Sequence, residues 1–331
     1  MTAATACLKT GHLVRTSVLV LILTLSSFTA THAVILKGDG DPESNTKAPA
    51  GALFDSGWQY QGNWGGCLGT PVAPQYFVAA RHVGGVIGQT FEFCGASYHA
   101  VALYDDPNTD LRLWKVDGTF PYWAPLYLGN DEIGKPLLVF GRGTQRGDPV
   151  VVPCVQTNLF TNVVNLRESG LNKKQAQQAF PDAKIQGQLM TVVTLEVVTN
   201  DSMKGWKAGV GDGRMRWGQN HVLSTGSFIA ASFDFEGGEN EAYLSSGDSS
   251  GGLFIQENGV WKLAGINYGV EGPYSTSPED PWFYGAIFDT SGLYGYGMPV
   301  PYDDNGQRKP ACFYATRISP RLPWIMSIIG Q

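Results

Sequence analysis

The sequence predicts an all-β protein, and three observations support this class. Glycine is abundant (42 of 331 residues), aromatic residues make up 12% of the chain and charged residues 16%, a composition typical of many strands joined by turns. Short apolar runs bounded by turn residues recur along the chain, as at 76–80 and 111–116. Clear helical propensity is confined to one stretch within 165–188.

The first 33 residues have the features of a signal peptide. Lys9 and Arg15 give a weakly basic start, 18–25 is an apolar core, and 31–33 (Thr-His-Ala) places small residues around a cleavage site. A retained membrane anchor is the alternative, but the apolar core is short for a bilayer span. We therefore expect a secreted or periplasmic protein, exported through this signal peptide and not attached to a membrane after cleavage.

The mature chain starts at Val34 with a polar, turn-rich segment that extends to about residue 52. Its acidic residues lack the spacing of an EF-hand loop, so we expect a solvated surface and not a calcium site. Strand-like runs follow at 76–80, 90–93, 98–103, 111–116, 136–140, 190–198, 227–235, 252–256 and 261–268. A domain junction is expected between 118 and 150.

Three later segments stand out from this strand pattern. The helical stretch within 165–188 ends at Pro181 and resembles an insertion on a β scaffold. The segment 270–310 is rich in glycine, proline and tyrosine, and its length suggests the rim of a binding site. Residues 316–325 predict a short terminal helix.

Charge and cysteine content exclude some classes of function. The net charge of −6 provides no basic surface for nucleic acid. After removal of the signal peptide four cysteines remain, which in an oxidising compartment predict two disulfides with three pairings open: Cys67, Cys94, Cys154 and Cys312. No CxxC pair is present, so no metal site is expected.

The loop 244–252 (Leu-Ser-Ser-Gly-Asp-Ser-Ser-Gly-Gly) is a run of small residues with one acid. Such a loop can present a serine hydroxyl and turn amide hydrogens toward a bound oxygen, although an ordinary turn is an equal alternative. A serine nucleophile needs a base, usually histidine, and the histidine needs a carboxylate that fixes its tautomer. Of the three histidines in the mature chain, His82 ends an apolar strand, whereas His99 and His221 have less suitable surroundings.

Five segments in register resemble the motifs of chymotrypsin-like (trypsin superfamily) serine proteases, most closely exported bacterial members. The segment 69–82, ending in Ala-Ala-Arg-His, resembles the histidine block, and 110–116 (Asp-Leu-Arg-Leu-Trp-Lys-Val) resembles the aspartate block. Residues 247–249 (Gly-Asp-Ser) resemble the nucleophile block. The segment 261–269 is similar to the strand that lines the substrate cleft, and 316–325 to the terminal helix. The order His, Asp, Ser also matches this family.

The resemblance implies a fold of two six-stranded antiparallel β-barrels with the active-site cleft between them and a short C-terminal helix. The first barrel would span 34–140, and the second 141–331 with insertions near 165–188 and 270–310. It also implies roles for individual residues. Ser249 would be the nucleophile, His82 the general base and Asp110 its carboxylate, with the oxyanion hole formed by backbone amides of Gly247 and Ser249, and the substrate bound by Tyr243, Asn267, Tyr268 and Gly269.

The sequence departs from the family pattern in four places. Ser250 stands where the family has glycine, and in the alternative register set by 251–252 Ser250 itself would be the nucleophile. Val83 replaces a cysteine, which implies the pairings Cys67–Cys94 and Cys154–Cys312. No Ile-Val-Gly-Gly activation site is present, so the amine of Val34 would pair with Asp248 directly after signal cleavage. Tyr243 replaces the charged residue of trypsin-like specificity pockets, which predicts no preference for Lys or Arg.

These expectations combine into a secreted serine endopeptidase that forms an acyl-enzyme, acts on protein or peptide substrates and needs no cofactor or metal. Two other classes remain open. A catalytically inactive homologue that serves as a secreted binding module is suggested by Ser250 and the 270–310 segment. An exported carbohydrate-binding protein would suit the aromatic and glycine content but leaves the ordered motifs unexplained. The oligomeric state does not follow from the sequence.

Overall fold

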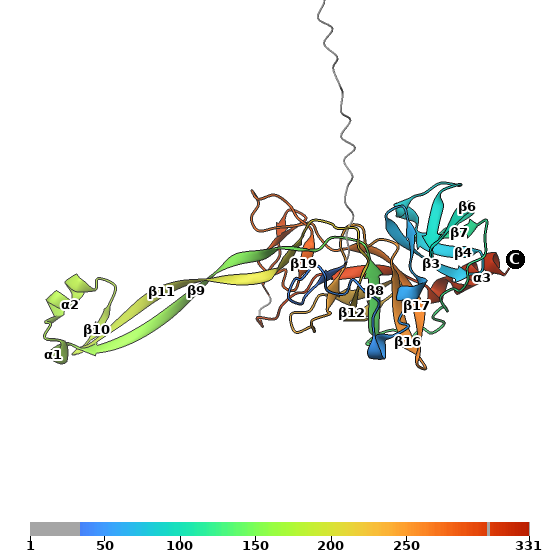
Figure 1. Cartoon of the computed structure of the whole chain (residues 1–331). Helices are drawn as coiled ribbons and strands as arrows, with labels where there is room; N and C mark the ends of the chain where they lie inside the picture. The colour runs from blue at the N-terminus through green and yellow to red at the C-terminus, as the bar shows by residue number, and fades with distance from the viewer. Residues whose placement is uncertain (1–33, 303–304, 331) are drawn as a thin grey trace, which may run out of the picture.

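The computed structural model describes residues 34–302 and 305–330, with the backbone alone at 154–159, 194–196 and 198–199. The predicted signal peptide lies outside these residues. Strands make up 44% and helices 11%, which confirms the all-β class. The strands form one closed six-stranded barrel, one half-barrel, a long protruding arm and smaller sheets (Figure 1).

The closed barrel has the strand order β2-β3-β4-β7-β6-β5. Its strands are β2 Gly62–Trp64, β3 Cys67–Ala73, β4 Tyr76–Ala80, β5 Thr90–Phe93, β6 Ala96–Asp105 and β7 Leu111–Val116. Buried aromatic rings fill it, with Phe77 stacked on Phe91 at 4.0 Å and Trp64 against Trp114 at 4.7 Å. The end of β4 is paired with the start of β7, because Ala80 lies opposite Leu111.

The second sheet is a half-barrel with the order β12-β8-β16-β17-β22-β14-β13. Its strands are β8 Pro136–Gly141, β12 Arg216–His221, β13 Ser224–Thr225, β14 Phe228–Ser232, β16 Gly252–Glu257, β17 Val260–Val270 and β22 Cys312–Arg317. It is not the closed six-stranded barrel that the resemblance implies. The strands that follow β8 in the chain leave this sheet and pair with one another. β8, which precedes the boundary expected at residues 140 and 141, belongs to this sheet.

The barrel and the half-barrel share one apolar cluster. Leu111 and Leu113 of the barrel pack with Leu138 and Phe254 of the half-barrel. The C-terminal segment, η4 Ser319–Arg321 and α3 Leu322–Ile329, packs Ile325 into the same cluster and includes the predicted terminal helix. Arg321 forms an ion pair with buried Asp106, which fastens this segment to the loop after β6.

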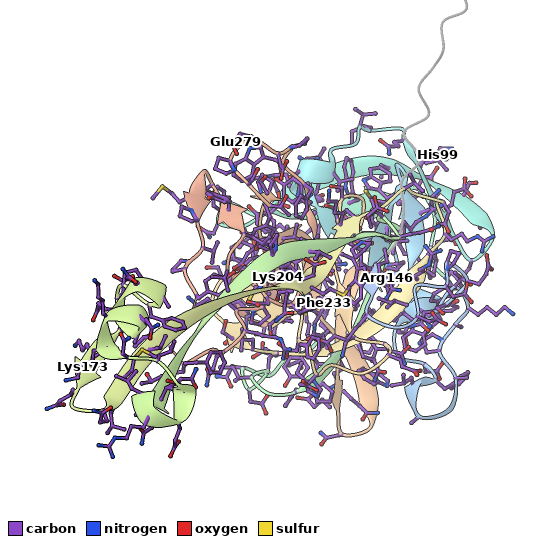
Figure 2. The ribbon with its side chains drawn as sticks, turned by 90° about the vertical axis from the view of Figure 1, so that its left-hand side faces the viewer. His99, Arg146, Lys173, Lys204, Phe233 and Glu279 are labelled. Atoms are coloured by element: carbon purple, nitrogen blue, oxygen red, sulfur yellow. The ribbon has the colours of Figure 1, made fainter. Side chains whose placement is uncertain are left out.

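The arm is a two-stranded antiparallel ribbon, β9 Arg146–Asn165 and β11 Leu189–Ala208, that extends away from the body (Figure 1). Its tip carries α1 Leu166–Ser169, α2 Lys173–Ala179 and β10 Lys184–Gln186, so the predicted helix is α2 and ends before Pro181. Lys173 marks the tip in Figure 2, and Arg146 and Lys204 mark the root. Lys204 is 2% exposed and its Nζ lies 2.6 Å from Asp289, an ion pair that anchors the root to the body.

Short strands complete the structure. β1 Ile35–Leu36 pairs with β15 Ala242–Tyr243, which places the start of the described chain inside the second unit. The 270–310 segment contains β18 Tyr274–Ser275, β19 Gly285–Ile287, β20 Tyr294–Gly295 and β21 Met298–Pro299, of which β19 pairs with the root of β11. Three single-turn helices lie in the first half of the chain: η1 Gly51–Leu53, η2 Trp58–Tyr60 and η3 Arg81–Val83.

The predicted disulfides are not formed. Cys67, Cys94 and Cys312 are free thiols, so neither Cys67–Cys94 nor Cys154–Cys312 exists in this structure. Cys94 occupies the turn between β5 and β6 and donates a hydrogen bond to the Tyr122 hydroxyl instead. Cys154 belongs to the arm, where its backbone pairs with Asn200, whereas Cys312 begins β22 of the half-barrel. Count and spacing of cysteines do not specify these positions.

Candidate active site

Three loops bring the predicted catalytic side chains together where the barrel meets the half-barrel. His82 lies on η3, directly after β4, and Asp110 directly precedes β7. The pairing of these two strands sets their separation, since the Arg81 N–H donates to the Asp110 carbonyl at 2.5 Å. Ser249 comes from the other unit, in the loop between β15 and β16.

The three side chains form a continuous hydrogen-bonded chain. His82 Nε2 lies 2.7 Å from Ser249 Oγ, and His82 Nδ1 lies 2.5 Å from Asp110 Oδ2. The His82 backbone N–H also donates to Asp110 Oδ1 at 3.0 Å, so the carboxylate holds both the ring and the main chain of the histidine. The Asp110 side chain is 11% exposed and that of His82 is 41% exposed, which leaves the imidazole open to a substrate.

The other acids and histidines near these motifs have different partners. Asp105 forms a bidentate pair with Arg112, and Asp106 is bound to Arg321. His99 pairs with Asp117 at 3.1 Å on the surface of the barrel, as expected of a residue in an exposed strand. Of the three acids from the end of β6 to the start of β7, Asp105, Asp106 and Asp110, the one that contacts His82 is Asp110.

Ser250 points into the protein and not toward His82. It is fully buried, and its hydroxyl accepts the Ala80 N–H at 2.6 Å. Its φ of +70° lies in the left-handed region that glycine adopts most easily. The serine at this glycine position is therefore accommodated by a hydrogen bond to the end of β4, and Ser249 is the serine within reach of the histidine.

A cradle of donors surrounds the buried carboxylate of Asp248. The Gly143 N–H donates to Oδ1 at 2.7 Å, while the N–H and hydroxyl of Ser245 donate to Oδ2 at 2.7 and 2.9 Å. The Val34 backbone N–H donates to the same carboxylate. A Cβ at Gly141, the last residue of β8, would lie 1.9 Å from Asp248 Oδ1, so this position can only be glycine.

Burial raises the pKa of Asp248 to about 7, because the hydrogen bonds and the charge of Arg216 offset only part of the loss of hydration. The carboxyl is wholly enclosed by neutral donors, with no cation in direct contact among the described residues. Asp248 thus lies in a site that would be stabilised further by a positive charge at the Val34 nitrogen.

The amides assigned to the oxyanion hole lie on the same loop. Gly247 has a φ of +95°, a conformation that suits glycine, and it lies two residues before Ser249. Within the described part of the chain, neither the Gly247 N–H nor the Ser249 N–H has a hydrogen-bond partner. Both donors are therefore available to an oxygen placed beside Ser249.

A cavity of about 320 Å³ opens beside Ser249. Its walls are mostly apolar and small polar residues, among them the predicted Asn267, Tyr268 and Gly269, together with Leu244, Ser245, Ser246, Val270 and Tyr284. Tyr243 is not part of this lining: it is fully buried in the core, and its hydroxyl donates to the Cys312 carbonyl at 2.8 Å.

Asn267 holds the nucleophile loop against β8. Its Nδ2 donates to the carbonyls of Phe140 and Asp248 at 2.8 and 3.0 Å, and its backbone pairs with Ser250 and Gly251. Tyr268, the next residue, is 41% exposed and stands edge-on to the His82 ring at 6.0 Å. One segment of β17 therefore supports the loop and also forms a wall of the cavity.

Sequence reasoning missed the cradle of Asp248. No role is expected from the sequence for Gly141 or Gly143, and Ser245 is expected only as part of the small-residue run 244–252. The Gly-Arg-Gly spacing at 141–143 is the sequence feature that could have indicated these donors, since two glycines around one residue suggest a close approach of another group.

No known family model matches the sequence, and no curated protein is significantly similar to it. Among residues 34–302 and 305–330, no cluster of His, Cys, Asp or Glu could hold a metal ion, and no helix combines the length and apolar character needed to cross a membrane.

Proposed function

We propose that the protein is a serine endopeptidase of the chymotrypsin-like type, secreted or periplasmic, that hydrolyses peptide bonds through an acyl-enzyme. The chain of contacts from Ser249 through His82 to Asp110 carries this proposal. Each link is of hydrogen-bond length, and each residue type suits its role: a hydroxyl nucleophile, an imidazole base and a carboxylate that orients it. The barrel and half-barrel are compatible with this type of protease.

The proposed reaction follows from the geometry. His82 Nε2 accepts the Ser249 proton as Oγ attacks the substrate carbonyl, and Asp110 stabilises the imidazolium that forms. The negative oxygen of the tetrahedral intermediate would accept hydrogen bonds from the Gly247 and Ser249 amides, and each such donor contributes roughly 3–4 kcal/mol to the barrier reduction. His82 then donates its proton to the leaving amine. Water repeats the sequence on the acyl-enzyme and restores Ser249.

A fluorophosphonate probe tests the proposal directly. The reagent is expected to modify Ser249, because attack needs a serine activated by histidine. Modification should disappear in Ser249→Ala and persist in Ser250→Ala, which changes the adjacent hydroxyl but not the triad. Mapping the modified peptide by mass spectrometry identifies the serine. A well-folded protein that remains unmodified would instead support the inactive binding module.

The lining of the cavity predicts an apolar or small side chain on the substrate residue before the cut bond. Apart from Asp248, whose carboxylate is satisfied by the cradle, no charged residue lines the cavity in the part of the chain that the structure describes. An inserted Lys or Arg would therefore lose its hydration without gaining a counter-charge. We expect kcat/KM for peptides with Ala, Val or Leu at this position to exceed that for Lys or Arg by about 10²-fold or more. A peptide library with this position varied measures the ratio, and a clear preference for Lys or Arg would contradict the proposed cavity.

A further inference from the structure

The arm leaves one of its edges open. Among the described strands, β9 pairs with β11 alone, and no strand is paired along its opposite edge. β11 is different, because its ends pair with β10 at the tip and with β19 at the root. Open strand edges present N–H and C=O groups that can pair with another chain.

Two prolines show which residues of β9 face that edge. Pro149 and Pro153 have no N–H, and proline is tolerated in a sheet where its nitrogen faces away from the ladder. Both are odd-numbered, and backbone groups alternate between the two sides of a strand with a period of two. Odd positions of β9 therefore point to the open edge, while even positions bond to β11. Beyond residue 153, β9 contains no further proline.

The outer part of β9 also lacks charge. No Asp, Glu, Lys or Arg occurs from residue 149 to 166, although 18 residues at the average of this chain (16% charged) would contain about three. Natural proteins usually protect open edges with charged residues, especially lysine. β11 does carry such residues, Glu196 and Asp201. The absence of charge is thus specific to the β9 side of the arm.

Large apolar side chains are exposed along the ribbon near this edge. Phe160 is 48% exposed, Val163 60%, Val193 58% and Val197 56%. Val163 lies opposite Thr191, and Val193 opposite Thr161, so these residues form cross-strand pairs on one face. The root is anchored by Lys204 with Asp289 and by Arg146, whose guanidinium donates to the carbonyls of Lys37 and Asp39 at 2.8 and 2.7 Å. The arm is accordingly a fixed projection in which β9 carries no charge from residue 149 to its end at residue 165.

We propose that β9 is a dimerisation edge, on which β9 of a second copy of this chain pairs antiparallel to form a four-stranded sheet of two arms. A strand that pairs antiparallel with its own copy satisfies two-fold symmetry, so one edge serves both partners. The chain carries a net charge of −6, which disfavours close approach of two copies elsewhere, but the outer part of β9 is neutral and stands away from the body (Figure 1).

The asymmetry between the two edges favours a closed dimer over a filament. Growth beyond two copies would require β11 to accept a strand as well, and β11 is occupied at both ends and carries acids between them. The two bodies would remain apart, since 20 residues of strand extend roughly 65 Å. This inference is independent of the proposed proteolytic activity.

Analytical ultracentrifugation of the mature chain tests the proposal. The wild type is expected to be a dimer at micromolar concentration, whereas Val163→Lys places a charge from each copy on the uncharged part of β9 and should weaken the dimer at least tenfold. Val260→Lys is the matched control, because it adds the same charge at a valine of similar exposure (50%) on the body and should leave the dimer intact. Thr161→Pro, at an outward-facing odd position, should also give a monomer while keeping the ladder to β11.

Hydrogen exchange provides a second measurement. In the dimer the amides of Thr161 and Val163 should be protected from exchange. Dilution or Thr161→Pro should remove the protection of the Val163 amide, while the even-numbered amides of β9 stay protected by β11. Circular dichroism confirms that each variant is folded. The proposal would be overturned by a wild type that is monomeric throughout the micromolar range or by a dimer that survives both arm substitutions. It would also be overturned if Val260→Lys weakened the dimer as much as Val163→Lys does.

Discussion

Replacing His82 with alanine is expected to lower kcat for peptide hydrolysis by about 10⁴- to 10⁶-fold, because Ser249 then has no group to accept its proton. Asp110→Asn should reduce kcat by about 10⁴-fold, since an amide can hold the imidazole in the wrong tautomer. His82 lies on the single-turn helix η3 and Asp110 in the loop before β7, both outside the buried core, so the thermal transition should change little. Steady-state kinetics on a peptide substrate and a melting curve measure the two effects separately.

The surface pair of His99 and Asp117 provides matched controls. It has the same chemical groups at 3.1 Å, but with side chains 54% and 47% exposed, and lies outside the triad. His99→Ala and Asp117→Asn should therefore leave kcat within about twofold of the wild type, as surface ion pairs contribute little. If substitutions in the two pairs lowered kcat by similar factors, His82 would act through stability and not through catalysis.

The sequence motifs predicted the triad because each member is marked locally. His82 follows an apolar strand, Asp110 precedes one, and Ser249 lies in a run of small residues. The distances of 2.5 and 2.7 Å depend on two tertiary features that no local pattern contains: the pairing of β4 with β7, and the packing of the barrel on the half-barrel.

The arm was the largest feature not predicted. The segment 146–165 contains two prolines, which ordinarily argue against a strand, yet β9 is 20 residues long. The prolines are tolerated because β9 has an open edge, and an edge position is a property of the assembled sheet. The same strands explain the half-barrel, since β9 and β11 form the arm instead of closing the second sheet.

The disulfide pairings failed for a related reason. They were inferred from a family pattern in which Val83 replaces a cysteine, whereas the structure places Cys154 in the arm and Cys312 in the half-barrel. Four cysteines allow three pairings, and sequence separation carries no information about which thiols meet.

A chain that begins at Val34 is expected to be about 10²- to 10³-fold more active than the same chain with one extra residue before Val34. Val34 is 1% exposed, its nitrogen donates to Asp248, and β1 is already paired with β15. A free terminal ammonium at this nitrogen would give the buried carboxylate its missing counter-charge. Loss of one partner from a buried ion pair costs roughly 3–5 kcal/mol, and Asp248 lies between the two proposed oxyanion donors.

The pH dependence distinguishes the two chains. With a neutral peptide nitrogen at Val34, the pKa of Asp248 is raised to about 7, above its ordinary value of 3.8. The folded state of the extended chain then binds the proton more tightly than the unfolded state, so this stabilisation is full below pH 3.8 and is lost as the pH rises through about 7. In the chain with a free amine the ammonium keeps Asp248 ionised, and this loss should be absent. Melting temperatures between pH 5 and 8 measure the difference.

Asp248→Asn separates the charge from the shape of the cradle. If the ammonium acts through Asp248, this substitution should lower the activity of the Val34 chain and remove most of the difference between the two chains, because each change eliminates the same ion pair. Active-site titration of all four proteins on one substrate gives the coupling. Equal activity of the Val34 and extended chains, with Asp248 intact, would mean that the oxyanion loop is ordered by Gly143 and Ser245 alone, and that cleavage before Val34 has no role in activation.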